Sequence, residues 1–108
     1  MAEPTSAATF KSARKKPSHS IAVILPCYRE TAHILPVIEN IGAEVQAVYV
    51  VDDACPDHTG DYVQENCTDK RVRVIRQDVN TGVGGAMVTG YQQAIKDGND
   101  ILIKMDGD

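Results

Sequence analysis

Four apolar segments divide this chain, and each has the length and composition of a β-strand. Residues 21–25 and 45–51 are almost unbroken in hydrophobicity, which is typical of strands buried on both faces of a parallel sheet. Residues 72–75 partly alternate, so this strand is expected nearer to an edge of the sheet. Residues 101–105 are interrupted only by Lys104 and predict a fourth, buried strand.

Helical patterns fill the intervals between these strands. Residues 31–41 carry four apolar side chains at helical spacing: Ile34, Leu35, Ile38 and Ile41. Pro36 fits such a helix only near its first turn. A shorter second helix is expected to reach Cys67, and a glycine-rich turn at residues 80–85 precedes a third helix that runs to about Ile95.

The predicted elements therefore alternate between strand and helix along the whole chain. This alternation favours right-handed crossovers and an α/β, Rossmann-like fold, in which a parallel sheet has helices on both faces. In such sheets, ligands bind outside the carboxyl ends of the strands. Polar residues follow all four predicted strands, at 26–30, 52–53, 76–78 and 106–108. The sequence thus predicts one binding site at a shared edge of the sheet.

The net charge of −4 is distributed unevenly. Residues 1–19 hold four basic side chains and one acidic side chain, and we predict that they form a disordered basic tail. Residues 20–108 hold seven basic and fourteen acidic side chains, and we predict that they belong to one domain. A body this acidic argues against nucleic-acid binding, because phosphate contacts require clustered lysines and arginines.

The cysteines indicate a reducing, cytoplasmic environment. Cys27, Cys55 and Cys67 are too few and too irregularly spaced for a disulfide framework. No apolar run approaches the roughly 18 residues that a membrane-spanning helix needs. Residues 1–19 also lack the apolar centre of a secretory signal.

The most informative motif is Asp106-Gly107-Asp108, at the exit of the last predicted strand. Two carboxylates this close repel each other unless a cation neutralises them. Mg²⁺ is typically held by one or two carboxylates together with phosphate oxygens of a substrate. Gly107 leaves room for a bulky ligand to approach the backbone. We therefore predict a site for a metal ion and a diphosphate here.

Two further strand exits supply candidate ligands for a nucleoside. Asp52 and Asp53 could simply close a strand, since aspartate is common in turns. Because Asp106 and Asp108 make a second strand exit acidic, we favour the alternative, in which a carboxylate at residues 52–53 binds a nucleobase or a ribose. Tyr28 offers a stacking face and Glu30 a hydrogen-bond acceptor. Cys27 is interpreted as a small apolar core residue rather than a nucleophile.

The glycine-rich segment at residues 80–86 fits neither standard phosphate-binding loop. A dinucleotide fingerprint that begins at Gly82 would need glycine where Met87 stands. A Walker-type loop that begins at Gly85 would need lysine where Tyr91 stands. We favour close packing between helix and sheet as the reason for these glycines. Contact between the helix N-terminus and an anion is the alternative.

Together these segments resemble the family 2 glycosyltransferases, whose nucleotide-sugar domain has the GT-A fold. The resemblance covers about residues 20–108 and rests on four motifs in the same order: Pro26-x-Tyr28-x-Glu30, Val50-Val51-Asp52-Asp53 with Pro56-Asp57-His58-Thr59-Gly60, Asn80-x-Gly82-x-Gly84-x-Ala86, and Met105-Asp106-Gly107-Asp108. Within the family, the chain is most similar to the polyprenyl- or dolichyl-phosphate sugar transferases. Arg29 stands where the family commonly has Asn, and Ala54 where it has Gly or Asn.

The resemblance implies a nucleoside-diphosphate-sugar donor, a Mg²⁺ or Mn²⁺ ion, and an acceptor such as a polyprenyl phosphate. It implies a nucleotide-binding site made of Pro26, Tyr28, Glu30, Val51, Asp53, Asp106 and Gly107, with the metal held by Asp106 and Asp108. In this family the catalytic base and the acceptor-binding half follow the Asp-x-Asp motif. The chain therefore resembles the donor-binding half of a longer enzyme, and this segment alone is expected to be inactive. The implied location is the cytoplasm or the cytoplasmic face of a membrane, reached through a part beyond Asp108.

Three other functions compete with this interpretation. A nucleotidyltransferase of similar architecture would need a glycine-rich loop directly after the first strand, whereas residues 26–30 contain no glycine. A phosphatase with an Asp-x-Asp nucleophile usually carries this motif after the first strand of its domain, not after the fourth. A non-catalytic domain that binds nucleotide sugars is the third alternative.

Overall fold

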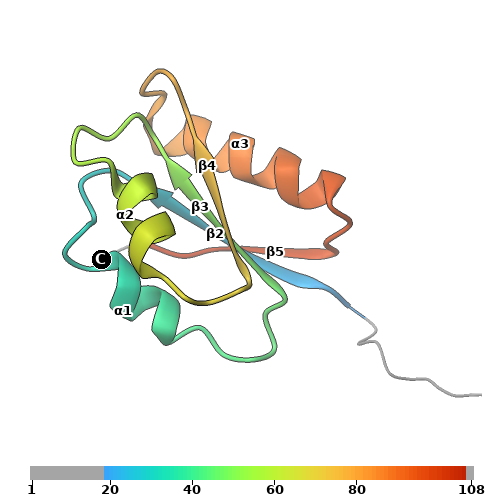
Figure 1. Cartoon of the computed structure of the whole chain (residues 1–108). Helices are drawn as coiled ribbons and strands as arrows, with labels where there is room; N and C mark the ends of the chain where they lie inside the picture. Colours follow the sequence, from blue (N-terminus) through green and yellow to red (C-terminus); the bar gives the residue numbers. More distant parts are fainter. Residues whose placement is uncertain (1–18, 107–108) are drawn as a thin grey trace, which may run out of the picture.

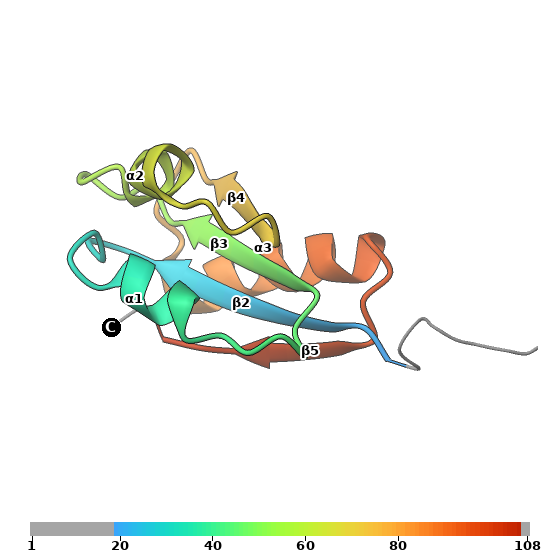
Figure 2. The same ribbon diagram turned by 60° about the horizontal axis from the view of Figure 1, so that its bottom comes forward.

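The structure is a computed structural model that describes residues 19–106, so Gly107, Asp108 and nearly all of the predicted tail lie outside the described residues. The described residues form β2 (Ile21–Cys27), α1 (Ile34–Glu39), β3 (Ala47–Asp52), α2 (Thr59–Asn66), β4 (Val72–Arg76), α3 (Gly82–Lys96) and β5 (Ile101–Lys104). The strands are parallel and lie in the order β4–β3–β2–β5. Figures 1 and 2 show α1 and α2 on one face of the sheet and α3 on the other. The predicted Rossmann-like α/β fold is confirmed.

Side chains of the two central strands alternate between two cores. Val23, Leu25 and Val50 lie in the core beneath α1 and α2. Ile24 and Tyr49 lie in the core beneath α3. All six residues of β3 are buried, because β3 has a strand on each side and helices on both faces. This double-sided burial explains the almost continuous hydrophobicity of the central strands.

The first helix is shorter than the pattern at residues 31–41 suggested. α1 begins at Ile34, and Pro36 lies in its first turn, as predicted. The carbonyl of Glu30 accepts hydrogen bonds from the N–H groups of His33 and Ile34, at 3.0 and 2.9 Å. The residues directly after β2 are thus held in a turn before the helix starts.

The predicted strand at residues 101–105 exists as β5. The prediction that this strand is buried is wrong. Among the described strands, β5 pairs with β2 alone and lies at an edge of the sheet. Ile101 and Ile103 are 38% and 42% exposed. Ile103 pairs with Val23 and so points to the face of α1 and α2. α2 packs against β3 and β4, at the other side of the sheet, and Ile103 is not part of the core beneath these two helices. β4 is the opposite edge, as its partial alternation predicted.

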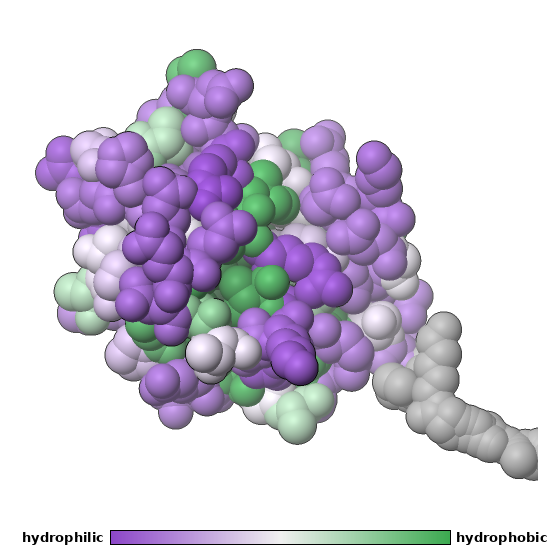
Figure 3. Space-filling view, viewed as in Figure 1, coloured by the Kyte–Doolittle hydropathy of each residue, from purple (hydrophilic) through white to green (hydrophobic). Residues whose placement is uncertain are grey.

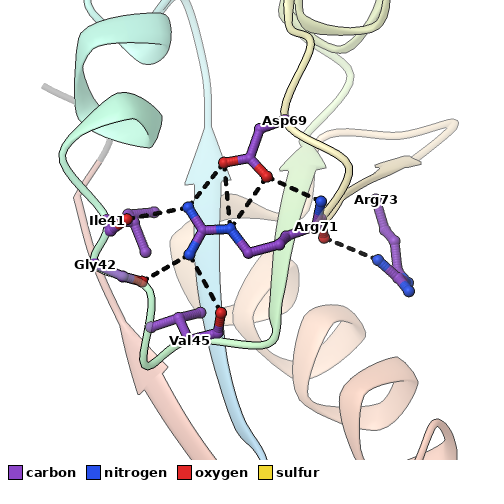
Figure 4. A network of polar contacts seen from close by, with 6 residues as sticks. All are labelled: Ile41, Gly42, Val45, Asp69, Arg71 and Arg73. Atoms are coloured by element: carbon purple, nitrogen blue, oxygen red, sulfur yellow. Dashed lines mark hydrogen bonds and ion pairs between the residues drawn. The ribbon is translucent and has the colours of Figure 1, made fainter.

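Polar contacts around Arg71 connect the loop before β3 to the segment before β4 (Figure 4). The Arg71 guanidinium donates to three carbonyls of the loop before β3, those of Ile41, Gly42 and Val45, at 3.0, 2.7 and 3.2 Å. It also pairs with Asp69 at 2.8 Å. The hydrogen bonds from Arg71 lower the pKa of the Asp69 carboxyl group. One side chain thus closes an irregular loop at the end of the sheet that lies away from the strand exits.

The surface of the molecule is mostly polar on the face seen in Figure 3. Hydrophilic residues cover most of this face, and hydrophobic residues show mainly in a strip near its centre. Within residues 19–106, none of the helices combines the length and the apolar character needed to cross a membrane.

Candidate functional site

The exits of three neighbouring strands meet around one pocket. It is lined by residues from the end of β2, from the loop after β3, from the start of α3 and from the segment after β5: Pro26, Cys27, Tyr28, Glu30, Asp53, Val83, Ala86 and Asp106. The cavity measures about 130 Å³, which is smaller than the roughly 300–1,000 Å³ of complete ligand sites. The pocket can therefore enclose only part of a ligand as large as a nucleotide.

The turn after β2 carries an exposed aromatic ring. Tyr28 is 43% exposed, and the guanidinium carbon of Arg29 lies 5.5 Å from the centre of its ring. The Arg29 N–H donates to Sγ of Cys55 at 2.9 Å, which ties this turn to the loop after β3. The Tyr28 ring thus lies at the pocket, with the Arg29 cation against it.

Asp52 and Asp53 are adjacent and both buried, but they have different hydrogen-bond partners. Asp52 is buried, and its two oxygens accept hydrogen bonds from the N–H groups of Cys55 and Gly60, both at 2.8 Å. These bonds hold the loop that connects β3 to α2. Asp52 is therefore a structural carboxylate, consistent with the interpretation that it closes a strand.

Asp53 faces the pocket and is anchored through one oxygen. Its Oδ1 accepts hydrogen bonds from Nε2 of Gln77 at 2.8 Å, from the N–H of Thr81 at 2.8 Å and from the Thr81 hydroxyl at 3.1 Å. Within the described residues, its Oδ2 accepts none. Thr81 directly precedes α3, so the positive end of this helix dipole stabilises the carboxylate. Oδ2 is the oxygen that this arrangement leaves for a ligand.

Three residues with left-handed backbone lie in the loops beside the pocket. Arg29, Ala54 and His58 have φ values of 60°, 56° and 53°. A residue with a Cβ atom adopts this conformation at a cost of roughly 1–2 kcal/mol, whereas glycine and asparagine adopt it more readily. This geometry explains why the glycosyltransferases that the chain resembles commonly have Asn or Gly at two of these positions, those of Arg29 and Ala54.

The two cysteines near the pocket differ in their acidity. Burial raises the pKa of the Cys27 thiol to about 12, and the charges of Glu30 and Asp52 add to this effect. Cys27 is 1% exposed, which confirms that it is a core residue. Burial also acts to raise the pKa of Cys55, but hydrogen bonds with Thr59 and the backbone of Arg29 outweigh it and lower the pKa overall.

Asp106 lies at the open side of the pocket. Its side chain is 74% exposed and pairs with Lys104 at 3.2 Å. Asp106 lines the same pocket as Asp53, so these two predicted acidic residues lie at a common edge of the sheet. The predicted partners Gly107 and Asp108 fall outside the described residues.

The glycines of the segment at residues 80–85 lie in the first turn of α3, which begins at Gly82, rather than in a turn before the helix. A Cβ atom on Gly82 or Gly84 would meet no atom within 4 Å. A Cβ atom on Gly85 would clash with Oγ1 of Thr81, the residue before the helix. The prediction that packing between helix and sheet explains these glycines is therefore wrong, since Gly85 is crowded by Thr81 and not by a strand. Close packing occurs further along, because a Cβ atom on Gly90 would lie 2.5 Å from Cγ2 of Ile24. Gly82 has a φ of +78°, so its own requirement is conformational.

The structure brings five predicted site residues together in the pocket lining: Pro26, Tyr28, Glu30, Asp53 and Asp106. Val51 is not among the lining residues, since its side chain is fully buried in the core beneath α3. Its part in nucleotide binding stays a prediction. The sequence reasoning missed Val83 and Ala86, although both lie in the glycine-rich segment that it singled out. It also missed Gln77, whose only signal was its place just after a strand.

The family model described as "Glycosyl transferase family 2" matches residues 22–108. Among curated relatives, an undecaprenyl-phosphate mannosyltransferase of Micrococcus luteus is 33% identical over 82% of this chain and 37% of its own length. A dolichol-phosphate mannosyltransferase of Pyrococcus furiosus is 30% identical over 82% of this chain and 25% of its own length. A polyprenol monophosphomannose synthase of Mycolicibacterium smegmatis is 29% identical over 86% of this chain and 37% of its own length. The chain thus spans 25% to 37% of the length of these relatives.

Proposed function

Because the chain belongs to glycosyl transferase family 2, we propose that its pocket binds the nucleoside-diphosphate end of a sugar donor. The observation that carries this proposal is the meeting of polar side chains from separate strand exits: Tyr28 and Glu30, Asp53, and Asp106 all line one cavity. A cavity of about 130 Å³ encloses only part of such a donor, and we assign that part to the nucleoside end. The sugar then lies outside it, toward the acceptor.

In this proposal the two sides of the pocket recognise different parts of the donor. Pro26, Tyr28, Glu30 and Asp53 form the nucleoside side, and Val51 supports it from the core beneath α3. The tyrosine ring stacks on the base, and Oδ2 of Asp53 accepts a hydrogen bond from the base or the ribose. Asp106 and Gly107 form the diphosphate side.

A divalent cation, Mg²⁺ or Mn²⁺, would be held by Asp106 and Asp108. No group of three or more metal-ligating side chains occurs within residues 19–106. One exposed carboxylate at the open side of the pocket nevertheless fits the way in which Mg²⁺ is bound, through one or two carboxylates plus the phosphate oxygens of the substrate. When bound, the ion would neutralise negative charge on the departing nucleoside diphosphate.

We further propose that the acceptor is a polyprenyl phosphate. The names of the relatives support this class, since each refers to undecaprenyl phosphate, dolichol phosphate or a polyprenol. The whole enzyme would then act at the cytoplasmic face of a membrane. Its three free cysteines support a reducing environment.

A thermal-shift experiment tests donor binding. UDP-sugars and GDP-sugars are added to the purified chain with and without Mn²⁺, and a ligand that binds only the folded form raises Tm. We expect a rise for one nucleotide class, with a smaller rise when Mn²⁺ is omitted or when Asp106 is changed in Asp106→Asn. Glu65→Gln, an exposed acid-to-amide change on α2, is the matched control and should respond like the unaltered chain. A folded chain whose Tm responds to no nucleotide sugar would contradict the proposal.

A further inference from the structure

Gln77 has a complete set of polar contacts behind the pocket. It directly follows β4, and its side chain does not line the cavity. Its Nε2 donates to Oδ1 of Asp53 at 2.8 Å and to the Thr81 hydroxyl at 2.7 Å. Its Oε1 accepts a hydrogen bond from the Thr89 hydroxyl at 2.6 Å. Both ends of the amide are therefore held by the protein.

The chemistry of these partners determines which way the amide points. An ionised carboxylate only accepts hydrogen bonds, so the nitrogen end of Gln77 must face Asp53. A reversed amide would place an oxygen against the carboxylate. The Thr89 hydroxyl, on the second turn of α3, reaches both the oxygen end of Gln77 at 2.6 Å and the Gly85 carbonyl at 3.2 Å, so the orientation of the amide is determined by Asp53 and not by Thr89. The backbone of Gln77 is also fixed, because its N–H donates to the Asp52 carbonyl at 2.9 Å.

We propose that Gln77 is a positioning residue for the donor nucleoside and acts through Asp53. It holds Oδ1 from the side of β4, while Thr81 holds the same oxygen from the start of α3. Rotation of the carboxylate would break both sets of bonds. Oδ2 is thereby kept toward the pocket as the oxygen that accepts a hydrogen bond from the nucleoside. This inference rests on the proposed function.

The test compares nucleotide affinity in variants of neighbouring residues. Gln77→Met keeps the approximate shape of the side chain but removes its donors. Calorimetric titration of the purified chain with UDP and with GDP, each with Mn²⁺, should show binding weakened by about fivefold to tenfold. This loss is within the range for one ordinary hydrogen bond, because Thr81 still holds Oδ1 in the variant. Arg76→Met is the matched control, since Arg76 pairs with Asp61 on α2 and not with Asp53. It should bind with unchanged affinity.

Two further variants separate positioning from general stability. In an Asp53→Asn background, Gln77→Met should cause no additional loss of affinity, because the carboxylate that it orients is gone. A residue that merely stabilises the fold would not show this dependence. If Gln77→Met does not fold, Thr89→Val is the variant that tests the inference. It keeps the Nε2 donors of Gln77 but removes the hydroxyl that contacts Oε1 of Gln77. It should weaken nucleotide binding by a smaller factor than about fivefold.

The outcomes distinguish this inference from the proposed function. A folded Gln77→Met that binds as tightly as the unaltered chain overturns the inference alone. The inference is also overturned if Gln77→Met weakens nucleotide binding equally with Asp53 and with Asn at position 53. If Gln77→Met does not fold, unchanged affinity in Thr89→Val overturns the inference instead. If the unaltered chain binds neither nucleotide, both the proposed function and the role of Gln77 are refuted.

Discussion

Replacing Gly90 by alanine should destabilise this protein, although alanine is the better helix former. A Cβ atom at this position would lie 2.5 Å from Cγ2 of Ile24 and 3.2 Å from Cγ2 of Val51. Both neighbours are fully buried on the central strands. Because non-bonded carbons prefer separations of about 3.5–4.0 Å, α3 or these side chains would have to move by roughly 1 Å. Neither can move freely in a close-packed core.

The expected magnitude follows from two opposing effects. Inserting a methyl group into a packed core costs about 1–3 kcal/mol. Replacing glycine by alanine in a helix interior contributes about 0.8–1.0 kcal/mol in the other direction. The net result for Gly90→Ala is a loss of about 1 kcal/mol in the free energy of unfolding, which corresponds to a fall in Tm of about 4–8 °C for a domain of this size.

Gly84 provides a matched control in the same helix. A Cβ atom at this position meets no atom within 4 Å, so Gly84→Ala gains helix propensity without a steric penalty. It should stabilise the protein by about 0.5–1 kcal/mol. Urea unfolding followed by far-UV circular dichroism gives both values under one set of conditions. Stabilisation of the same size by both substitutions would refute the close approach of α3 to β2 and β3.

The remaining predictions concern the two ends of the sheet. Arg71→Met removes the donors to three backbone carbonyls. It should lower the free energy of unfolding by about 2 kcal/mol, less than three fully buried hydrogen bonds would contribute, because water reaches the partly exposed carbonyls. An unchanged urea midpoint would contradict this prediction. Since the pKa of Asp69 lies below its ordinary value of 3.8 in the folded protein, its contribution is present above that pH and is lost as the pH falls further. The acid-induced loss of stability should therefore be shallower in Arg71→Met than in the unaltered chain. His58→Gly removes a Cβ atom from a residue with a φ of 53°. It should raise the free energy of unfolding by about 0.5–1 kcal/mol, because about 1–2 kcal/mol of backbone strain is removed while the more flexible glycine favours the unfolded chain. A lower Tm would show that the histidine side chain stabilises the fold by more than its strain costs.

The parts of the fold that depend on local patterns could be predicted from the sequence. The buried runs at 21–25 and 45–51 are strands because residues shielded on both faces must be almost uniformly apolar. The common edge of the strand exits followed from the parallel alternation of strands and helices. Five of the predicted site residues accordingly line one pocket.

The misjudged features depend on contacts between distant segments. The exposure of Ile103 follows from which strands have neighbours, and its own apolar run is no different from that of a central strand. Gly90 carries the close packing that the sequence analysis assigned to the glycines at the start of α3. Its contact with Ile24 joins residues from different elements, which no local pattern reveals.

The sequence by itself determined the order of the elements, the parallel sheet and the strand exits at which polar residues gather, because hydrophobic periodicity and chain connectivity are local properties. Only the tertiary structure decided how those polar residues are used. Asp52 and Asp53 are neighbours in the chain, yet one binds the loop toward α2 and the other is anchored by Gln77 and Thr81. Successive residues of an extended chain point to opposite sides, and the segments packed on each side determine which hydrogen-bond donors each of these two buried carboxylates meets.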